Sequence, residues 1–236
     1  MAKVTTEEQK FYSELSKNVV ALESARKKVN SQINEFLRKD DDFSVALYTK
    51  IYLLIYSSWT EAYLVKLVHT PSGFTATQKK SILSGQDVIN KWKKCVNTAF
   101  NKFEKKGSDV PNKKQKIHKL LDEYLKTQAN IRNKIAHGQW VFPLYKNNLA
   151  HDPDAQTLIN LIDVIQIDTW FEVFKEISEI VRGLIDAKHR NNHLSHYNYY
   201  FERIVKIQEI IMKRRKYTIQ DKKILLKKKP RFVETN

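Results

Sequence analysis

The sequence has few of the residues that interrupt helices, with only five glycines and five prolines among its 236 residues. Long stretches with an apolar period near 3.6 residues are joined by short polar breaks, which is the pattern of amphipathic helices that pack on one another. The sequence therefore predicts an all-α helical bundle, and its length allows one sizeable hydrophobic core.

Cysteine is nearly absent, and long apolar runs are missing. Cys95 is the single cysteine, which excludes an intrachain disulfide. The most apolar run, 51–64, is too short to cross a bilayer and contains Glu61. The first eight residues lack the apolar core of a signal peptide. We therefore expect a soluble, cytoplasmic protein that has no membrane partner.

Motifs for nucleotides and metals are also missing. No phosphate-binding loop, dinucleotide fingerprint or serine nucleophile elbow is present, so a nucleotide-driven enzyme has little support. The spacing of His189, His193 and His196 can place all three on one helical face. No cysteine or acidic residue lies among them, and structural zinc usually takes four ligands. We predict neither a metal site nor a cofactor.

Positive charge is abundant. Lysine and arginine number 42 against 26 acidic residues, a net charge of +16, which attracts polyanions. RNA, DNA, an anionic membrane and an acidic protein all fit this charge. The C-terminal part interleaves basic and apolar residues, a composition suited to RNA backbone contacts, although a solvated terminus is the alternative. The predicted RNA-binding residues here are Lys213, Arg214, Arg215 and Lys216.

One short motif carries chemistry. Residues 132–138 read Arg-Asn-Lys-Ile-Ala-His-Gly at the end of a strongly helical run. On a helix Asn133 and His137 share a face, and Arg132 lies on the adjoining side. Histidine exchanges protons near neutral pH, and arginine fits phosphate oxygens, so the set suits attack by an RNA 2′-OH on the adjacent phosphorus. The alternative is that these side chains only cap the helix end.

This stretch resembles the R-x4-6-H signature of the HEPN superfamily, in its common form of Arg-Asn, two residues and Ala-His. HEPN proteins are all-α RNases and RNA-binding modules, and they include toxins and abortive-infection proteins. The motif-level resemblance covers about 45–140. Gln139 replaces a tyrosine found in some of these toxins, so control by modification of that tyrosine is not expected. A second match, Arg190 to His196, lacks the flanking alanine and glycine.

The resemblance implies a HEPN-type bundle with additional N- and C-terminal helices. One domain would span 1–216 with a core of about 43–187, followed by a basic tail over 217–236. It further implies a metal-independent endoribonuclease that works as a homodimer, with Arg132 and His137 of both subunits in one composite site. One histidine would act as base and the other as acid, giving 2′,3′-cyclic phosphate and 5′-OH ends. Asn133 and Lys134 would support the phosphate.

The same resemblance suggests a biological role and leaves two alternatives open. A toxin or antiviral-defence effector would have an antitoxin or regulatory protein as partner. The alternatives are a catalytically silent module that binds RNA and a helical protein that binds an acidic partner.

Glu61 is the one acidic residue in the apolar helix expected over 52–68. A buried carboxylate is costly unless it is paired, so we expect Glu61 to contact Arg132 or His137 and to belong to the site. HEPN proteins often carry such a residue opposite the motif helix. The alternative is that Glu61 reaches solvent or pairs with Lys66.

Apolar periodicity also predicts the order of the helices. The expected elements are a first helix with a stripe over 11–36, then helices over about 43–69, 88–107, 112–137, 156–187 and 194–216. The segment 156–187 is either one helix or a pair, and serves as a core or dimer helix. The loop between 138 and 154 either shapes the site entrance or only connects two helices.

Overall fold

The computed structural model describes residues 6–101, 109–190 and 193–228. Over these ranges the chain forms nine helices and no strand, which confirms the predicted all-α class. The helices are α1 (Thr6–Arg38), α2 (Asp42–Val68), α3 (Ala76–Leu83), α4 (Val88–Phe100), α5 (Asp109–Ala136), α6 (Pro153–Leu161), α7 (Val164–Arg190), α8 (His193–Arg214) and α9 (Ile219–Lys228). No helix in the described ranges is long and apolar enough to span a membrane.

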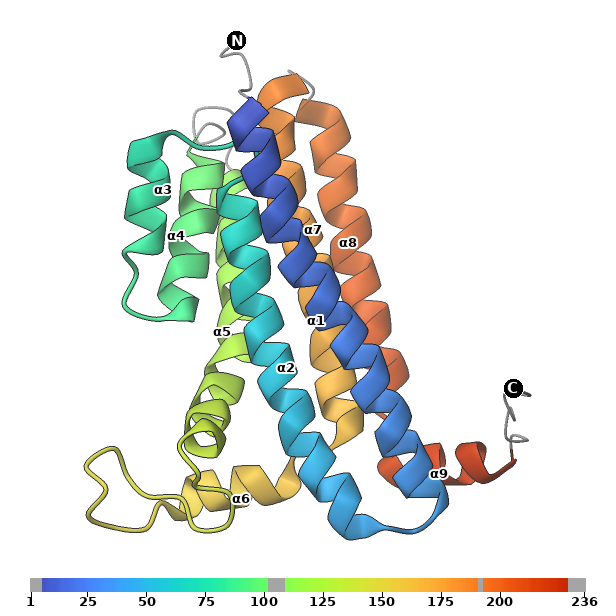
Figure 1. Ribbon diagram of the computed structural model, residues 1–236. Helices are drawn as coiled ribbons and strands as arrows, with labels where there is room; N and C mark the ends of the chain where they lie inside the picture. Colours follow the sequence, from blue (N-terminus) through green and yellow to red (C-terminus); the bar gives the residue numbers. More distant parts are fainter. Residues whose placement is uncertain (1–5, 102–108, 191–192, 229–236) are drawn as a thin grey trace.

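Five long helices, α1, α2, α5, α7 and α8, run along one another and form the body of the bundle (Figure 1). The short helix α4 packs beside α5, and α3 packs on α4. The C-terminal end of α5 leads into an irregular segment and α6. The C-terminal end of α5, which carries the motif, therefore lies where the bundle meets this segment, and its Ile131 and Ile135 are still buried in the core.

The sequence of α2 has no continuous polar face, and in the structure most of the surface of this helix is buried. Its aromatic side chains meet those of α7: the rings of Tyr56 and Phe171 lie edge to face with centroids 4.9 Å apart. Trp92 of α4 packs against Phe174 of α7 in the same way, at 5.0 Å. Edge-to-face pairs of this kind add to the free energy gained by burying the rings. The core thus joins α2, α4 and α7 into one unit.

Two of the predicted helix ends coincide with the expected signals. The acidic run 40–42 separates α1 from α2, and Asp41 caps α2 by accepting a hydrogen bond from the Ser44 backbone N–H at 3.0 Å. Gly138 follows α5 with a φ of +77°, the left-handed conformation that ends many helices. The sequence did not reveal α3, an eight-residue helix that begins with a capping box between Thr75 and Gln78.

Gly138 gives a test of this helix end. Nothing lies within 4 Å of the Cβ that alanine would add, so only backbone strain opposes the substitution. We expect Gly138→Ala to lower the free energy of unfolding by about 1 kcal/mol in urea denaturation. Gly138→Asn is the matched control and should cost less, because asparagine tolerates this conformation. Equal losses in the free energy of unfolding for the two variants would contradict the role of Gly138 as the left-handed residue that ends α5.

The segment 156–187 is a helix pair, α6 and α7, and α7 lies in the core. Its acidic residues bond to neighbouring helices of the same chain. Glu176 pairs with Arg203 at 2.6 Å and with Lys206 at 2.7 Å, both on α8. Because this face is occupied by α8, the core interpretation of the segment is the one that the structure supports.

The segment predicted as a basic tail contains a helix that packs on the bundle. Helix α9 lies across the end of α1 (Figure 1). Lys223 and Lys227 pair with Asp40 at 2.6 and 2.8 Å, and these hydrogen bonds lower the pKa of Asp40 to about 2. Lys222 reaches Asp168 of α7 at 3.4 Å. The domain boundary at 216 is therefore placed too early, and the folded unit continues to Lys228.

Candidate functional site

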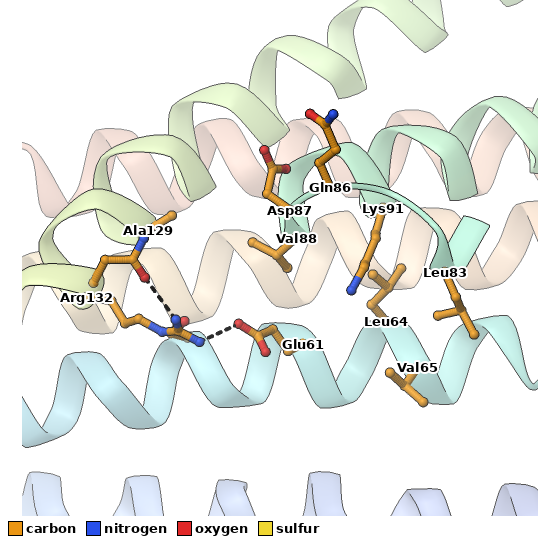
Figure 2. A pocket seen from close by; sticks show the side chains of 12 residues that line it. Glu61, Leu64, Val65, Leu83, Gln86, Asp87, Val88, Lys91, Ala129 and Arg132 are labelled. Carbon is orange, nitrogen blue, oxygen red and sulfur yellow. Dashed lines mark hydrogen bonds and ion pairs between the residues drawn. The ribbon is translucent and has the colours of Figure 1, made fainter. Parts of the chain in front are cut away.

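The centre of the candidate site is an ion pair between the motif helix and α2. The Arg132 Nη2 atom lies 2.8 Å from Glu61 Oε1, and Arg132 Nη1 donates to Asn133 Oδ1 at 2.9 Å. Figure 2 shows the guanidinium extending across from α5 to meet Glu61. The predicted contact between Glu61 and Arg132 is confirmed. The Arg132 side chain is 33% exposed and that of Glu61 46%, so the pair is accessible to a ligand.

This pair lies at one side of a cavity of about 360 Å³. The cavity is bounded by α2, by the connection from α3 to α4, and by α5 (Figure 2). Its lining residues are Ser57, Glu61, Leu64, Val65, Leu83, Gln86, Asp87, Val88, Lys91, Ala129, Arg132 and Asn133. Three of the predicted site residues, Glu61, Arg132 and Asn133, are thus brought together at a concave surface.

His137 is placed differently. It is the first residue after α5, its side chain is exposed, and it does not line the cavity. Its backbone N–H still bonds to the Asn133 carbonyl at 3.1 Å, so the helical geometry extends to this residue. In the part of the chain that the structure describes, its imidazole has no hydrogen bond or ion pair. His137 follows Arg132 by five positions, which corresponds to about 7.5 Å along a helix axis.

Lys134 was predicted as a phosphate contact, but the structure gives it internal partners. Its Nζ donates to the Leu144 carbonyl and lies 3.2 Å from Asp152 Oδ2. Asp152 also caps α6 by accepting from the Ala155 backbone N–H. The amine therefore ties α5 to the segment that follows it, and the loop 139–152 is held as a defined structure beside the motif.

Replacing this amine tests its role in the loop. We expect Lys134→Met to raise the hydrogen-exchange rate of the Tyr145 and Asp152 amides about tenfold, because both amides bond within the loop and the clamp limits its local opening. Lys146→Met is the matched control, since Lys146 is an exposed lysine of the same loop. Equal exchange in the two variants would show that Lys134 does not hold the loop.

The basic residues near the end of α8 belong to another region. Arg214 pairs with Glu172 at 2.8 Å, whereas Lys213, Arg215 and Lys216 are exposed. Arg214 and Arg215 line a second cavity, of about 540 Å³, between α5, α7 and the end of α8. Arg214 is thus partly neutralised, and the other three remain available for a polyanion.

Sequence reasoning missed the α3–α4 side of the site. Gln86, Asp87 and Lys91 line the first cavity, although none of them was singled out. The turn at 84–87, Ser-Gly-Gln-Asp, and the Asp87 cap of α4 were readable signals of a bend here. The sequence does not indicate which other helices this bend lies against, because that depends on tertiary packing.

Two other candidates from the sequence are Cys95 and the histidine-rich segment 189–196. Burial raises the pKa of the Cys95 thiol to about 12, which makes it a core residue and a poor nucleophile. The side chains of His189, His193 and His196 lie outside the described residues. Elsewhere in the described part of the chain, no three His, Cys, Asp or Glu residues gather as a metal site.

Comparison with known proteins does not assign this chain to a family. No family model, no curated protein and no solved structure matches this chain.

Proposed function

We propose that this protein is a metal-independent endoribonuclease of the HEPN type. The observation that carries the proposal is the Arg132 guanidinium, held by Glu61 and Asn133 at the edge of a cavity, next to a helix end where His137 is open to solvent. A fixed cation and, five positions later, an imidazole open to solvent suit the cleavage of RNA by its own 2′-OH.

Arg132 would hold the phosphate. A guanidinium has five N–H donors, and the two bonds to Glu61 and Asn133 leave three of them for phosphate oxygens. Because its neighbours already fix its orientation, little side-chain entropy is lost when the phosphate binds. The charge would also stabilise the phosphorane formed on the way to product.

His137 would act on the proton of the 2′-OH. As that proton leaves, the 2′-oxygen bonds to phosphorus and the bond from phosphorus to the 5′-oxygen breaks. A second acid protonates the departing 5′-oxygen, so the products are a 2′,3′-cyclic phosphate and a 5′-OH. In a homodimer His137 of the partner subunit supplies that acid, and the two motifs form a composite site.

Support for a partner comes from the surface that follows His137. Val141 is 80% exposed and Leu149 is 84% exposed, although the loop that bears them is held by internal hydrogen bonds. With Phe142 and Tyr145, which are 60% and 46% exposed, they gather four exposed apolar side chains in one short segment, and such a gathering favours an intermolecular contact. A second subunit bound there would lie next to the motif.

A single 2′-deoxy substitution tests the mechanism. An oligoribonucleotide that the protein cuts at one position is compared with the same oligonucleotide carrying 2′-deoxyribose immediately 5′ of that bond. We expect the substituted bond to stay intact while other bonds are still cut. Cleavage at the substituted bond would exclude attack by the 2′-OH.

The second candidate is a catalytically silent module that binds RNA or an acidic protein, such as an antitoxin. The net charge of +16 and the exposed Lys213, Arg215 and Lys216 favour it.

A toxin or antiviral-defence effector should arrest growth when expressed freely, and His137→Ala should relieve the arrest. A protein that only binds would show no such dependence on His137.

A further inference from the structure

The cavity beside Arg132 extends well beyond the ion pair. From Arg132 and Asn133 on α5 it continues past Glu61 to the connection between α3 and α4, where Gln86 and Lys91 line it. Figure 2 shows Lys91 reaching from α4 toward α2, on the far side of Glu61 from Arg132. A phosphate bound to Arg132 would leave this inner part of the cavity empty.

The charges of the lining argue against a second phosphate there. The cations Arg132 and Lys91 are balanced by the carboxylates Glu61 and Asp87. Asp87 is occupied by the first turn of α4, since its oxygens bond to the Asn90 N–H at 2.7 Å and to the Asn90 amide at 3.0 Å. The cavity as a whole is near neutral and suits an uncharged ligand with hydrogen-bonding groups.

We call the part of the cavity beyond Glu61 the slot, and its lining combines aliphatic and polar side chains. Leu64, Val65, Leu83 and Val88 supply aliphatic walls, while Ser57 and Gln86 add polar groups. A volume of about 360 Å³ is at the small end of the range of about 300–1,000 Å³ usual for ligand pockets. It fits one nucleoside better than a longer stretch of chain.

Lys91 is the distinctive group of this slot. In the described ranges its amine has no hydrogen bond or ion pair, although the residue is half-buried. Its stem packs on Gly85, where an added Cβ would lie 2.8 Å from the Lys91 Cγ and from its backbone nitrogen. A half-buried amine without a partner is a donor for a ligand acceptor.

We propose that this cavity is a subsite for one nucleobase of single-stranded RNA, adjoining the phosphate that Arg132 holds, with Lys91 donating to an acceptor on the base edge. The inference rests on the proposed function and makes it more specific. Unstacked bases are recognised through their edges in this way, and the subsite gives the enzyme a base preference at one position. The free Oε2 of Glu61 and the Gln86 amide complete the polar edge of the subsite.

Binding tests the subsite independently of cleavage. The probes are four dinucleoside monophosphates that differ in one base and carry 2′-deoxyribose at the position of attack, so they cannot be cut. Titration is followed by NMR at the amides of Lys91 and Val88. We expect one base to bind at least about fivefold more tightly than the weakest, and Lys91→Met to remove most of that preference.

Two further variants serve as controls for the effect of Lys91→Met. Ala129→Leu fills the cavity from α5 and should weaken binding of all four probes. Lys116→Met removes an exposed lysine of the same helix and should leave the preference unchanged. Equal binding of the four bases, or an equal response to Lys91→Met and Lys116→Met, would overturn the subsite.

The subsite and the proposed function can fail separately. Base-selective binding that depends on Lys91, with intact RNA in cleavage assays, would support the subsite and reject the RNase. A cleavage rate that does not depend on the bases flanking the cut, and that Lys91→Met leaves unchanged, would support the RNase and reject the subsite.

Discussion

Replacing His137 by alanine is expected to lower the rate of RNA cleavage by about 10²–10⁴-fold, the usual contribution of a general base or acid. The side chain is exposed and has no partner in the described structure, so its loss should leave the fold unchanged. Binding of RNA should also persist, because in the proposed mechanism Arg132, and not His137, holds the phosphate. The measurement is the first-order cleavage rate of an end-labelled oligoribonucleotide, beside its dissociation constant.

A second histidine at the same end of the molecule provides the control. The His151 ring stacks on Phe142 with centroids 4.2 Å apart, and His151→Phe keeps this contact while removing an imidazole. We expect its cleavage rate to stay within twofold of wild type. If His151→Phe lost as much activity as His137→Ala, the effect would come from the loop and not from proton transfer.

Replacing Asp168 by alanine is expected to lower the free energy of unfolding by about 3–5 kcal/mol, the cost of removing one partner of a buried charge network. Asp168 is 6% exposed and accepts hydrogen bonds from Tyr52 at 2.6 Å and from Asn30 at 2.8 Å. Arg26 and Lys222 each lie 3.4 Å from it. The substitution leaves both cations without their carboxylate, and burial already lowers the pKa of the Lys222 amine.

Chemical denaturation with two reference variants measures this effect. Lys222→Met removes one cation of the network and the contact that holds α9 to α7, so we expect a smaller loss. Glu14→Ala breaks an exposed pair with Lys17 and should change stability by less than about 1 kcal/mol. A loss for Asp168→Ala no larger than that for Glu14→Ala would show that the network contributes little.

Several features of the site could be predicted because their signals are local. A single glutamate in an otherwise apolar helix led us to expect a cation beside it, and Glu61 does contact Arg132. The reason is only partly the expected one, because the Glu61 side chain is 46% exposed and also reaches solvent. Gly138 ends the motif helix because glycine adopts positive φ without strain. The acidic run at 40–42 separates two helices for an equally local reason, the cap that Asp41 provides.

Other features depend on partners that are distant in sequence. Lys222 and Lys223 have the composition of a solvated tail, and only the folded chain brings them to Asp168 and Asp40. Lys134 has the charge of a phosphate contact, yet its partners lie in the loop that follows. A lysine on its own does not indicate whether its charge is used inside the fold or offered to a ligand.

The proposed nuclease can be tested by incubating purified wild-type protein, beside His137→Ala, with total RNA and with DNA in the presence of EDTA. We expect that wild type alone cuts RNA, leaving 2′,3′-cyclic phosphate and 5′-OH ends, and that DNA stays intact. RNA left intact by wild type, or cut equally by both proteins, would contradict the proposal.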